Sequence, residues 1–380
     1  MKCIINGKIL LEDKLLEGYS VVFDDKIRDV VRTEELKPKY FDVIDAEGKI
    51  VSPGLIDMHI HGYLGEDVSD GNADGIRKIA SGIIKNGVTS WCPTTMTVSK
   101  KEIEDAFDAV REVKNSSEFY GSKIVGINSE GPFINPSKKG AQAEEHILKP
   151  DGDFIIKHSD IVKLFTVAPE MDGAKECIEK VKKNGNILIS MGHTNATYDE
   201  AIEGIKLGVG STTHLFNAMS PLSHRSPGVV GAALSEDVYT ELIADTFHVD
   251  KGLFNMVAKA KGDKLVLITD CIRAGGMADG DYTLGGQDLK KEGIKCLMAD
   301  GTIAGSVLTL NMAVKNLYEN TGLSLADAFK CATLNPAKAL GIDKDYGAIE
   351  EGKCADLVIF DDEFNVNIVI TDGEIRYKGE

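Results

Sequence analysis

Histidine and acidic side chains follow several apolar, strand-like runs in this sequence. His59 and His61 end the run GLIDMHIHG, and Glu130 follows KIVGINS. His193 and His214 close two later runs, NILISMGH and STTH. Imidazole and carboxylate groups are common protein ligands of zinc and ferrous iron. Their repeated placement after strands indicates a metal site, provided that the fold brings the strand ends together.

Each of these residues also has a simpler interpretation. Residues two apart on a strand point to the same face, so His59 and His61 can reach one ion, but two hydrogen-bonded imidazoles would give the same pattern. Glu130 could be a solvated carboxylate at a turn. A lone histidine after a strand is more often a hydrogen-bonded structural group. Two such histidines, together with a glutamate on a third strand, favour the metal-ligand interpretation.

Asp270 ends KLVLITD, an almost wholly apolar run. A carboxylate there would be half desolvated, and in a closed barrel it would lie close to the first strand. That environment suits a general base that takes a proton from water at the metal. The alternative is an N-cap for the next segment. His146 and His224 lie in polar loops and are interpreted as surface or pocket-rim residues.

The elements that must position these side chains alternate along the chain. Amphipathic helical patterns such as ADGIRKIASGIIKNG and SKKEIEDAFDAVREVK lie between apolar strand-like runs. Eight such runs occur, GLIDMHIHG, VTSWCPTT, KIVGINSEGP, VKLFTVAPE, NILISMGHTN, STTHLFNAM, TELIADTFH and KLVLITDC. They predict an α/β fold, a (β/α)8 TIM-like barrel with its active site at the carboxyl ends of the strands. A doubly wound open sheet is the alternative, although no G-x-G-x-x-G follows an early strand.

Both ends of the chain contain patterns typical of short strands. KCIINGKIL and NIVITDGEIRYKG each contain an Asn-Gly or Asp-Gly turn between apolar alternations, which predicts hairpins. We expect residues 1–51 and 350–380 to form one small β-sandwich domain and residues 52–349 to form the hydrolase barrel. The segment after Asp270, with GGMADGDYTLGG and MADGTIAG, is expected to be a hairpin insertion before two closing helices.

The composition excludes several classes of protein. The net charge of −17 argues against nucleic-acid binding, although a locally basic pocket could still bind a small anion. The seven cysteines are scattered and form no C-x-x-C pair, which favours reduced thiols in a cytoplasm. No run approaches the ~20 apolar residues of a membrane helix, and the amino terminus lacks a signal-peptide core.

Taken together, these segments resemble the N-acetylglucosamine-6-phosphate deacetylase family of the amidohydrolase superfamily. The likeness spans most of the chain, through PGLIDMHIHG, GVTSWCPTT, NSEGPFINPSKKGAQ, FTVAPE, GHTNA, THLFNAMSPLSHRSPG, LIADTFHVD, ITDCIRAGG, DGTIAGS, ATLNPAKALG and EGKCADLVIFD. The motifs EGPF...KKGA and THLFNAM...HR distinguish this family from dihydroorotases and ureases, which share only the H-x-H barrel.

The resemblance implies metal-dependent hydrolysis of N-acetylglucosamine 6-phosphate to glucosamine 6-phosphate and acetate. It implies Asp270 as the catalytic acid/base and one or two divalent ions per subunit, zinc or iron. The implied metal ligands are Glu130, His193 and His214, with His59 and His61 at a second metal position.

The resemblance also implies contacts to the sugar phosphate and a homodimer with the partner chain close to the phosphate. Arg225 is the natural phosphate partner, because its planar fork makes paired hydrogen bonds to phosphate oxygens. Gln142 departs from the family pattern, since several members carry His there, and it cannot become cationic. The implied contacts are Ala141, Gln142, Asn217, Ala218, Arg225, His248, Ile303, Ala304 and Gly305.

Two other functions stay open at this point. A different amidohydrolase could act on a cyclic amide or an N-acyl amino acid. A catalytically inactive scaffold of the same fold is disfavoured, because every ligand-type position and Asp270 are intact.

Overall fold

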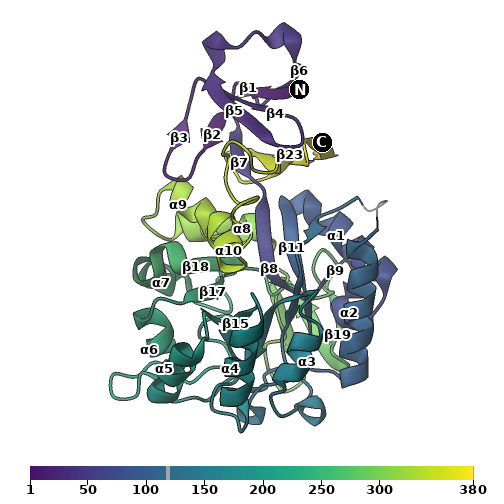
Figure 1. Ribbon diagram of the computed structural model, residues 1–380, viewed down its shortest axis with the longest axis vertical. Helices are drawn as coiled ribbons and strands as arrows, with labels where there is room; N and C mark the ends of the chain where they lie inside the picture. Colours follow the sequence, from purple (N-terminus) through teal and green to yellow (C-terminus); the bar gives the residue numbers. More distant parts are fainter. Residues whose placement is uncertain (117–119, 380) are drawn as a thin grey trace.

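A computed structural model, which describes residues 1–116 and 120–379, shows a barrel and a smaller β layer at one end of it (Figure 1). The barrel has eight parallel strands in the order of the chain, and this confirms the predicted fold. The strands are β8 (Leu55–Ile60), β11 (Val88–Thr95), β13 (Ile127–Ser129), β14 (Val162–Val167), β15 (Leu188–Met191), β16 (Ser211–Thr212), β17 (Tyr239–Ile243) and β18 (Leu265–Ile268). A short strand, β12 (Lys123–Ile124), also pairs with β11.

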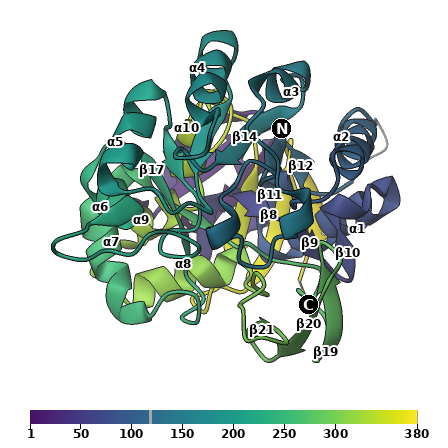
Figure 2. The same ribbon diagram turned by 90° about the horizontal axis from the view of Figure 1, so that it is seen from below.

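Helices surround the strands, and Figure 2 shows them from the side opposite the small β layer. Among the described residues they are α1 (Ala73–Ile83), α2 (Lys100–Lys114), α3 (Gly152–Lys157), α4 (Ala174–Asn184), α5 (Tyr198–Leu207), α6 (Gly228–Ser235), α7 (Phe254–Lys261), α8 (Leu310–Glu319), α9 (Leu325–Lys330) and α10 (Leu334–Ala339). No helix in the described ranges combines the length and the apolar character needed to cross a membrane.

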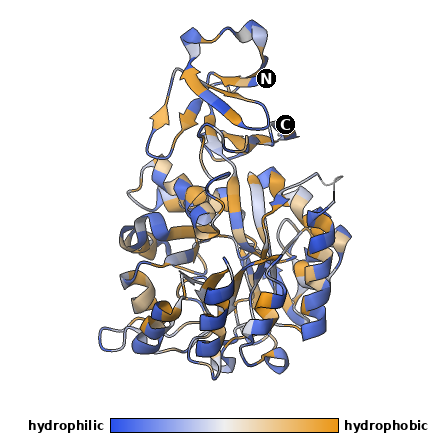
Figure 3. Cartoon of the chain, viewed as in Figure 1, coloured by the Kyte–Doolittle hydropathy of each residue, from blue (hydrophilic) through white to orange (hydrophobic). Residues whose placement is uncertain are grey.

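Helix α2 illustrates why these segments are helical. Ser99 and Glu102 form a capping box that satisfies free backbone amides at its start. Ile103, Phe107 and Val110 recur at helical spacing and are buried against the barrel. Figure 3 shows hydrophilic residues on the outward sides of such helices.

The two ends of the barrel differ, and only one is open. At the amino ends of the strands, Ala337 and Leu340 of the α10 region pack in one cluster with Ile56 and Val266. Across the closure, the Asp270 amide donates a hydrogen bond to the His59 carbonyl at 2.9 Å. The carboxyl ends are therefore left free for a site.

The small β layer is a sandwich of two sheets built from both ends of the chain, as predicted. One sheet has the order β5-β4-β1-β6 and the other β24-β23-β22-β7-β2-β3. Ile4, Val21 and Leu357 belong to the apolar cluster between them. The predicted boundaries at 51/52 and 349/350 stay a prediction. The strands are β1 (Lys2–Ile5), β2 (Lys8–Leu10), β3 (Leu15–Leu16), β4 (Tyr19–Phe23), β5 (Ile27–Arg32), β6 (Asp42–Asp45), β7 (Ile50–Pro53), β22 (Leu357–Phe360), β23 (Val366–Thr371) and β24 (Glu374–Lys378).

One predicted hairpin is present and the other is wrong. Asp372 and Gly373 join β23 to β24, and both have the positive φ of a two-residue hairpin turn. Asn6 and Gly7 instead carry the chain from one sheet to the other, since β1 pairs with β4 and β6 while β2 pairs with β3 and β7. A Cβ at Gly7 would lie 2.6 Å from a methyl group of Val51, so glycine is needed there for close approach.

The segment after Asp270 is larger than the predicted hairpin. It forms a three-stranded antiparallel sheet of β19 (Gly280–Leu284), β20 (Gln287–Glu292) and β21 (Lys295–Met298). Three helices follow it where two were expected, because α9 and α10 have six residues each and show too little periodicity to be recognised. A two-stranded hairpin, β9 (Gly62–Tyr63) and β10 (Glu66–Asp67), follows β8.

Lys123 joins the barrel to the carboxyl-terminal segment, and we expect its removal to destabilise the protein. Its ammonium lies 2.8 Å from Asp356 and 2.7 Å from Asp372. Burial raises the pKa of Asp356 although Lys123 opposes this. Lys123→Met would leave that buried carboxylate unpaired and should lower the free energy of unfolding in urea by about 2–4 kcal/mol.

Lys149→Met provides the matched control, because the Lys149 ion pair with Asp172 is exposed on both sides. It should leave the unfolding curve nearly unchanged. Equal stability of the two variants would contradict a buried link through Lys123.

Candidate active site

Three predicted residues at the strand ends have an unusual backbone. His193, His214 and Asp270 all have positive φ, at 47°, 31° and 50°. Residues with a side chain rarely adopt this left-handed region, and those that do are concentrated at functional sites. Main-chain hydrogen bonds hold all three, since the His193 carbonyl accepts from the Asn135 amide, the His214 carbonyl accepts from the Asn217 amide and the Asp270 amide donates to the His59 carbonyl. The strand ends are thus strained where the predicted chemistry lies.

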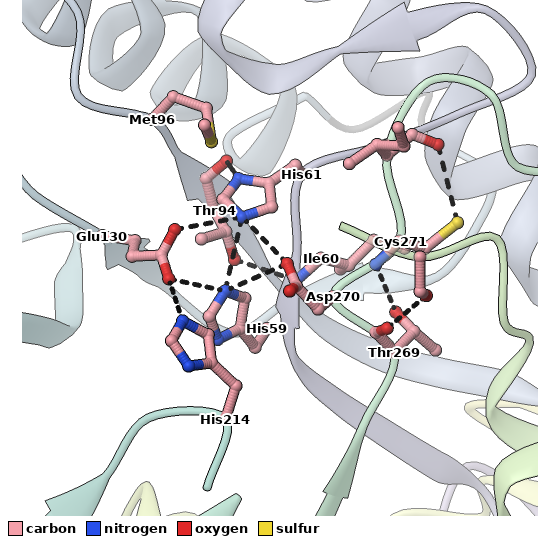
Figure 4. Close-up of polar contacts among 12 residues, drawn as sticks. His59, Ile60, His61, Thr94, Met96, Glu130, His214, Thr269, Asp270 and Cys271 are labelled. Atoms are coloured by element: carbon pink, nitrogen blue, oxygen red, sulfur yellow. Dashed lines mark hydrogen bonds and ion pairs between the residues drawn. The ribbon is translucent and has the colours of Figure 1, made fainter. Parts of the chain in front are cut away.

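The predicted metal ligands converge on Glu130, as Figure 4 shows for most of them. Oε1 of Glu130 lies 3.0 Å from His214 Nε2, 3.3 Å from His193 Nε2 and 3.4 Å from His59 Nε2. Its Oε2 lies 3.2 Å from His61 Nε2. All five side chains are buried. One carboxylate therefore joins four imidazoles that come from three strand ends.

Asp270 completes a second group with His59 of β8 and His61 directly after that strand. Its Oδ1 lies 3.2 Å from His61 Nε2 and 3.5 Å from His59 Nε2 (Figure 4). Two sets of ligand atoms, each closer together than 4.8 Å, could hold an ion: His59, His61 and Asp270; Glu130, His193 and His214.

The outer nitrogens of three histidines have acceptors. Nδ1 of His59 contacts the Glu241 carboxylate at 3.0 Å, that of His61 the Thr94 carbonyl at 3.2 Å and that of His193 the Lys138 carbonyl at 2.8 Å. These acceptors require Nδ1 to carry a hydrogen, so in the neutral imidazole each Nε2 directs a lone pair inward.

Those inward lone pairs fit a cation. His193 Nε2 and His214 Nε2 are 3.1 Å apart, and His59 Nε2 and His61 Nε2 are 3.3 Å apart. Two lone pairs at such distances repel unless a proton or a metal ion lies between them. The nitrogen and carboxylate donors match the ligands of zinc and iron, so the residues present fit a divalent metal.

Mutual electrostatics keep the acidic groups ionised. Burial alone would raise the pKa of Glu130, but His59 and His193 hold it well below its usual range. Burial likewise opposes ionisation of Asp270, while His61 and His59 lower its pKa overall. Burial lowers the pKa of His59, yet the carboxylates of Glu130 and Glu241 raise it to about 9. The site thus concentrates negative charge on Glu130 and Asp270, where a cation would be attracted.

A cavity of about 350 Å³ opens onto these groups. It brings together most of the residues predicted from the sequence, namely Glu130, His61, His193, His214, Asp270, Ala141, Gln142, Asn217, Ala218, His248, Ile303 and Gly305. His59 and Ala304 are buried behind this wall. Arg225 lies on an exposed turn and does not line the cavity, and His224 beside it is also exposed.

Some contacts within the site were not foreseen from the sequence. Gln142 is buried in the cavity wall, where its Nε2 donates to Glu130 at 2.6 Å and its Oε1 accepts from the Thr97 amide at 2.6 Å. Lys138 contributes the side-chain ammonium that lines the cavity, with its Nζ donating to the Met219 carbonyl. No spacing in the sequence indicates either contact, because both depend on how the loop after β13 folds back.

Comparisons with known proteins agree with this geometry. Residues 50–376 match the family described as the amidohydrolase family. The chain is 38% identical to an N-acetylglucosamine-6-phosphate deacetylase from Bacillus subtilis, over 97% of this chain and 95% of that protein. The chain belongs to the N-acetylglucosamine-6-phosphate deacetylase family of amidohydrolases.

Solved structures of this deacetylase family share the fold. A crystal structure of N-acetylglucosamine-6-phosphate deacetylase from Pasteurella multocida has a TM-score of 0.94 and 33% identity, with 100% of both chains covered. A mutant N-acetyl-D-glucosamine-6-phosphate deacetylase from Mycobacterium smegmatis, solved with N-acetyl-D-glucosamine 6-phosphate, has a TM-score of 0.91 and 29% identity, with 99% of both chains covered. Amidohydrolases are metal-dependent, and the two ligand groups of this member accord with that.

Proposed function

We propose that the protein hydrolyses the N-acetyl group of N-acetylglucosamine 6-phosphate, giving glucosamine 6-phosphate and acetate. The observation that carries this proposal is the contact of Glu130 with the histidines of both ligand groups, with Asp270 on the wall of the same cavity. The family relationship supports the choice of substrate. Such a reaction belongs to amino-sugar catabolism and cell-wall sugar recycling.

We propose that Glu130, His193 and His214 hold one divalent ion and that His59, His61 and Asp270 provide a second position. Zinc and iron both suit these donors. When bound, such an ion supplies Lewis acidity and lowers the pKa of a water molecule toward neutrality. The chain contributes the orientation of the ligands through the acceptors at their Nδ1 atoms.

Asp270 moves the proton in the proposed reaction. Its ionised Oδ1 accepts a proton from the attacking water while a bond forms to the acetyl carbon. The same oxygen then donates that proton to the amide nitrogen as the C–N bond breaks. The products are the free amine and acetic acid, which loses the second proton of the water to solvent and leaves as acetate, while Asp270 returns to its ionised form. The lowered pKa keeps Asp270 ionised at neutral pH, so its carboxylate carries no proton before the reaction.

The wall of the cavity would hold the sugar phosphate. His248 donates from Nδ1 to Asp245 at 2.6 Å, which leaves its Nε2 as the free position of the ring. We propose that His248, Asn217 and Gln142 contact the substrate directly. The remaining contacts would come from Ala141, Ala218, Ile303, Ala304 and Gly305. Binding energy from these distant contacts can hold the amide at the reacting groups.

A substrate panel with the zinc- or iron-loaded protein tests the proposed function. Release of acetate is measured for N-acetylglucosamine 6-phosphate, its galactosamine counterpart and N-acetylglucosamine without phosphate. An N-acetyl amino acid and a cyclic amide complete the panel. We expect kcat/KM for N-acetylglucosamine 6-phosphate to exceed, by about 100-fold or more, the values for unphosphorylated N-acetylglucosamine, the N-acetyl amino acid and the cyclic amide. The reason is that charge-assisted hydrogen bonds to a phosphate are stronger than neutral ones. Chelation should abolish turnover, and added metal should restore it.

Two results of this panel would contradict the proposal. Preferred turnover of the cyclic amide or of the N-acetyl amino acid would assign the site to a different amidohydrolase. A protein that retains no divalent ion under any preparation and turns over no substrate would be an inactive scaffold.

Arg225 is proposed as the phosphate partner, although it lies outside the cavity of a single chain. Arg225→Ala should raise KM for N-acetylglucosamine 6-phosphate about 10- to 100-fold, because charged hydrogen bonds are lost. The same change should leave kcat/KM for unphosphorylated N-acetylglucosamine unaltered. Arg32→Ala, on β5 of the small β layer, is the control for loss of an exposed arginine. An equal loss with both substrates would remove Arg225 from this role.

We also propose that the protein acts as a cytoplasmic homodimer whose partner chain lies close to the phosphate end of the cavity. All seven cysteines are free thiols, in keeping with a reducing compartment. Sedimentation of the metal-loaded protein would measure the oligomeric state.

A further inference from the structure

Glu241 is a buried carboxylate that has no part in the proposed reaction. It lies on β17, inside the barrel, and is fully enclosed. Burying a carboxylate is costly unless charge or hydrogen bonds compensate for it. Its Oε1 has no hydrogen-bond partner within residues 1–116 and 120–379. The free-energy cost of burying the Glu241 carboxylate suggests that this residue serves the neighbouring site.

A single oxygen of Glu241 contacts both ligand groups. Oε2 accepts a hydrogen bond from Nδ1 of His59 at 3.0 Å and another from the backbone amide of His214 at 3.1 Å. The two contacts differ in kind. For His214 the carboxylate holds only the main chain, whereas for His59 it holds the imidazole ring itself. Of these two histidines, therefore, only His59 has its ring hydrogen-bonded to Glu241.

The other histidines have weaker outer partners. Nδ1 of His61 and of His193 donate to main-chain carbonyls, and Nδ1 of His214 has no partner in the described part of the chain. A carboxylate raises the basicity of an imidazole ligand and fixes its tautomer more strongly than a neutral carbonyl does. Among these four histidines, His59 alone has a charged outer partner in the residues that the structure describes.

We infer that Glu241 is a positioning residue that fixes the tautomer of His59 and thereby secures occupancy of the metal position formed by His59, His61 and Asp270. This inference rests on the proposed function, since it presupposes metal binding. It also makes Glu241 the residue that decides whether a chain carries one ion or two. The position formed by Glu130, His193 and His214 should depend on Glu241 much less.

Glu241→Gln is the direct test, because the amide oxygen can still accept from His59 and from the His214 amide while the negative charge is gone. Ions per chain are measured by elemental analysis after dialysis against a series of zinc buffers of known free concentration. We expect the weaker of two binding steps to shift to about 10- to 100-fold higher free zinc and the tighter step to stay in place. Turnover lost at low zinc should return as the weaker position fills.

Thr240→Val is the matched control. Thr240 is the neighbouring residue on β17, is equally buried, and accepts a hydrogen bond from Thr212 without touching a ligand. Both binding steps should match those of the unaltered protein. Nitrogen-15 shifts of His59 in the zinc-loaded protein give a second readout, since the unaltered chain should show hydrogen on Nδ1 and the Glu241→Gln variant a weaker bond there.

The outcomes separate this inference from the proposed function. Two unchanged binding steps in Glu241→Gln would overturn the role of Glu241 and leave the deacetylase proposal intact. Equal weakening of both steps would overturn the selective effect on the His59 position. An unaltered protein that binds no ion would contradict the proposed function itself. If Glu241→Gln does not fold, the nitrogen-15 shifts of the unaltered protein still decide, since hydrogen on Nε2 of His59 would overturn the inference.

Discussion

Replacement of Asp270 by asparagine is expected to lower kcat about 100- to 10,000-fold, the range of general acid–base catalysis. Asparagine keeps the shape of the side chain but cannot accept the proton from water. The group formed by Glu130, His193 and His214 does not include Asp270, so at least one ion per chain should remain bound. Acetate release measures the turnover, and elemental analysis measures the retained metal.

Asp250→Asn is the control for this charge change. Asp250 is exposed and caps a short turn by accepting a hydrogen bond from Gly252. Its replacement should leave kcat unaltered. Turnover close to normal in Asp270→Asn would show that another group moves the proton.

Replacement of Glu130 by glutamine is expected to have an even broader effect. Glu130 contacts all four histidines, so the loss of its charge removes the shared anion of both ligand groups. We expect less than half of the normal metal content and a loss of about 1,000-fold or more in kcat/KM, since metal-ion catalysis contributes several kcal/mol. In Asp270→Asn, by contrast, at least one ion per chain should remain bound. Elemental analysis and acetate release on one preparation test both parts.

Glu112→Gln is the matched control, because Glu112 is an exposed partner of Arg77 on the outer helices. Its metal content and turnover should be normal. Full metal content in Glu130→Gln would contradict the dependence of metal binding on this carboxylate.

The barrel and most of the site were predictable because they follow from local patterns. Apolar runs define the strands, and polar residues directly after them must meet at one rim when the strands are parallel. His193, His214 and Asp270 illustrate this: each follows a strand, and the structure places all three on the wall of one cavity. The positive φ of these three residues could not be predicted from the sequence. Glycine is the usual sequence indicator of that backbone conformation, and none of the three is glycine.

What could not be predicted depends on contacts between distant segments. Glu241 lies within the apolar run TELIAD, and a carboxylate in such a run indicates a buried partner. The sequence does not indicate that this partner is His59. The contact of Gln142 with Glu130 depends on the path of a loop. The Asn6–Gly7 pair is typical of a hairpin turn, but here it connects a strand of one sheet to a strand of the other. Close packing of Gly7 against Val51, which the local sequence does not indicate, accompanies this connection.

The pairing of β7 with β22 has a consequence for biosynthesis. β7 lies between β2 and β22 in its sheet, so one side of it has no partner until the last part of the chain is made. The barrel strands emerge from the ribosome earlier and can collapse first, since domains generally fold as units during synthesis. A nascent or prematurely terminated chain would present the open backbone edge of β7, the kind of surface that seeds intermolecular strand pairing.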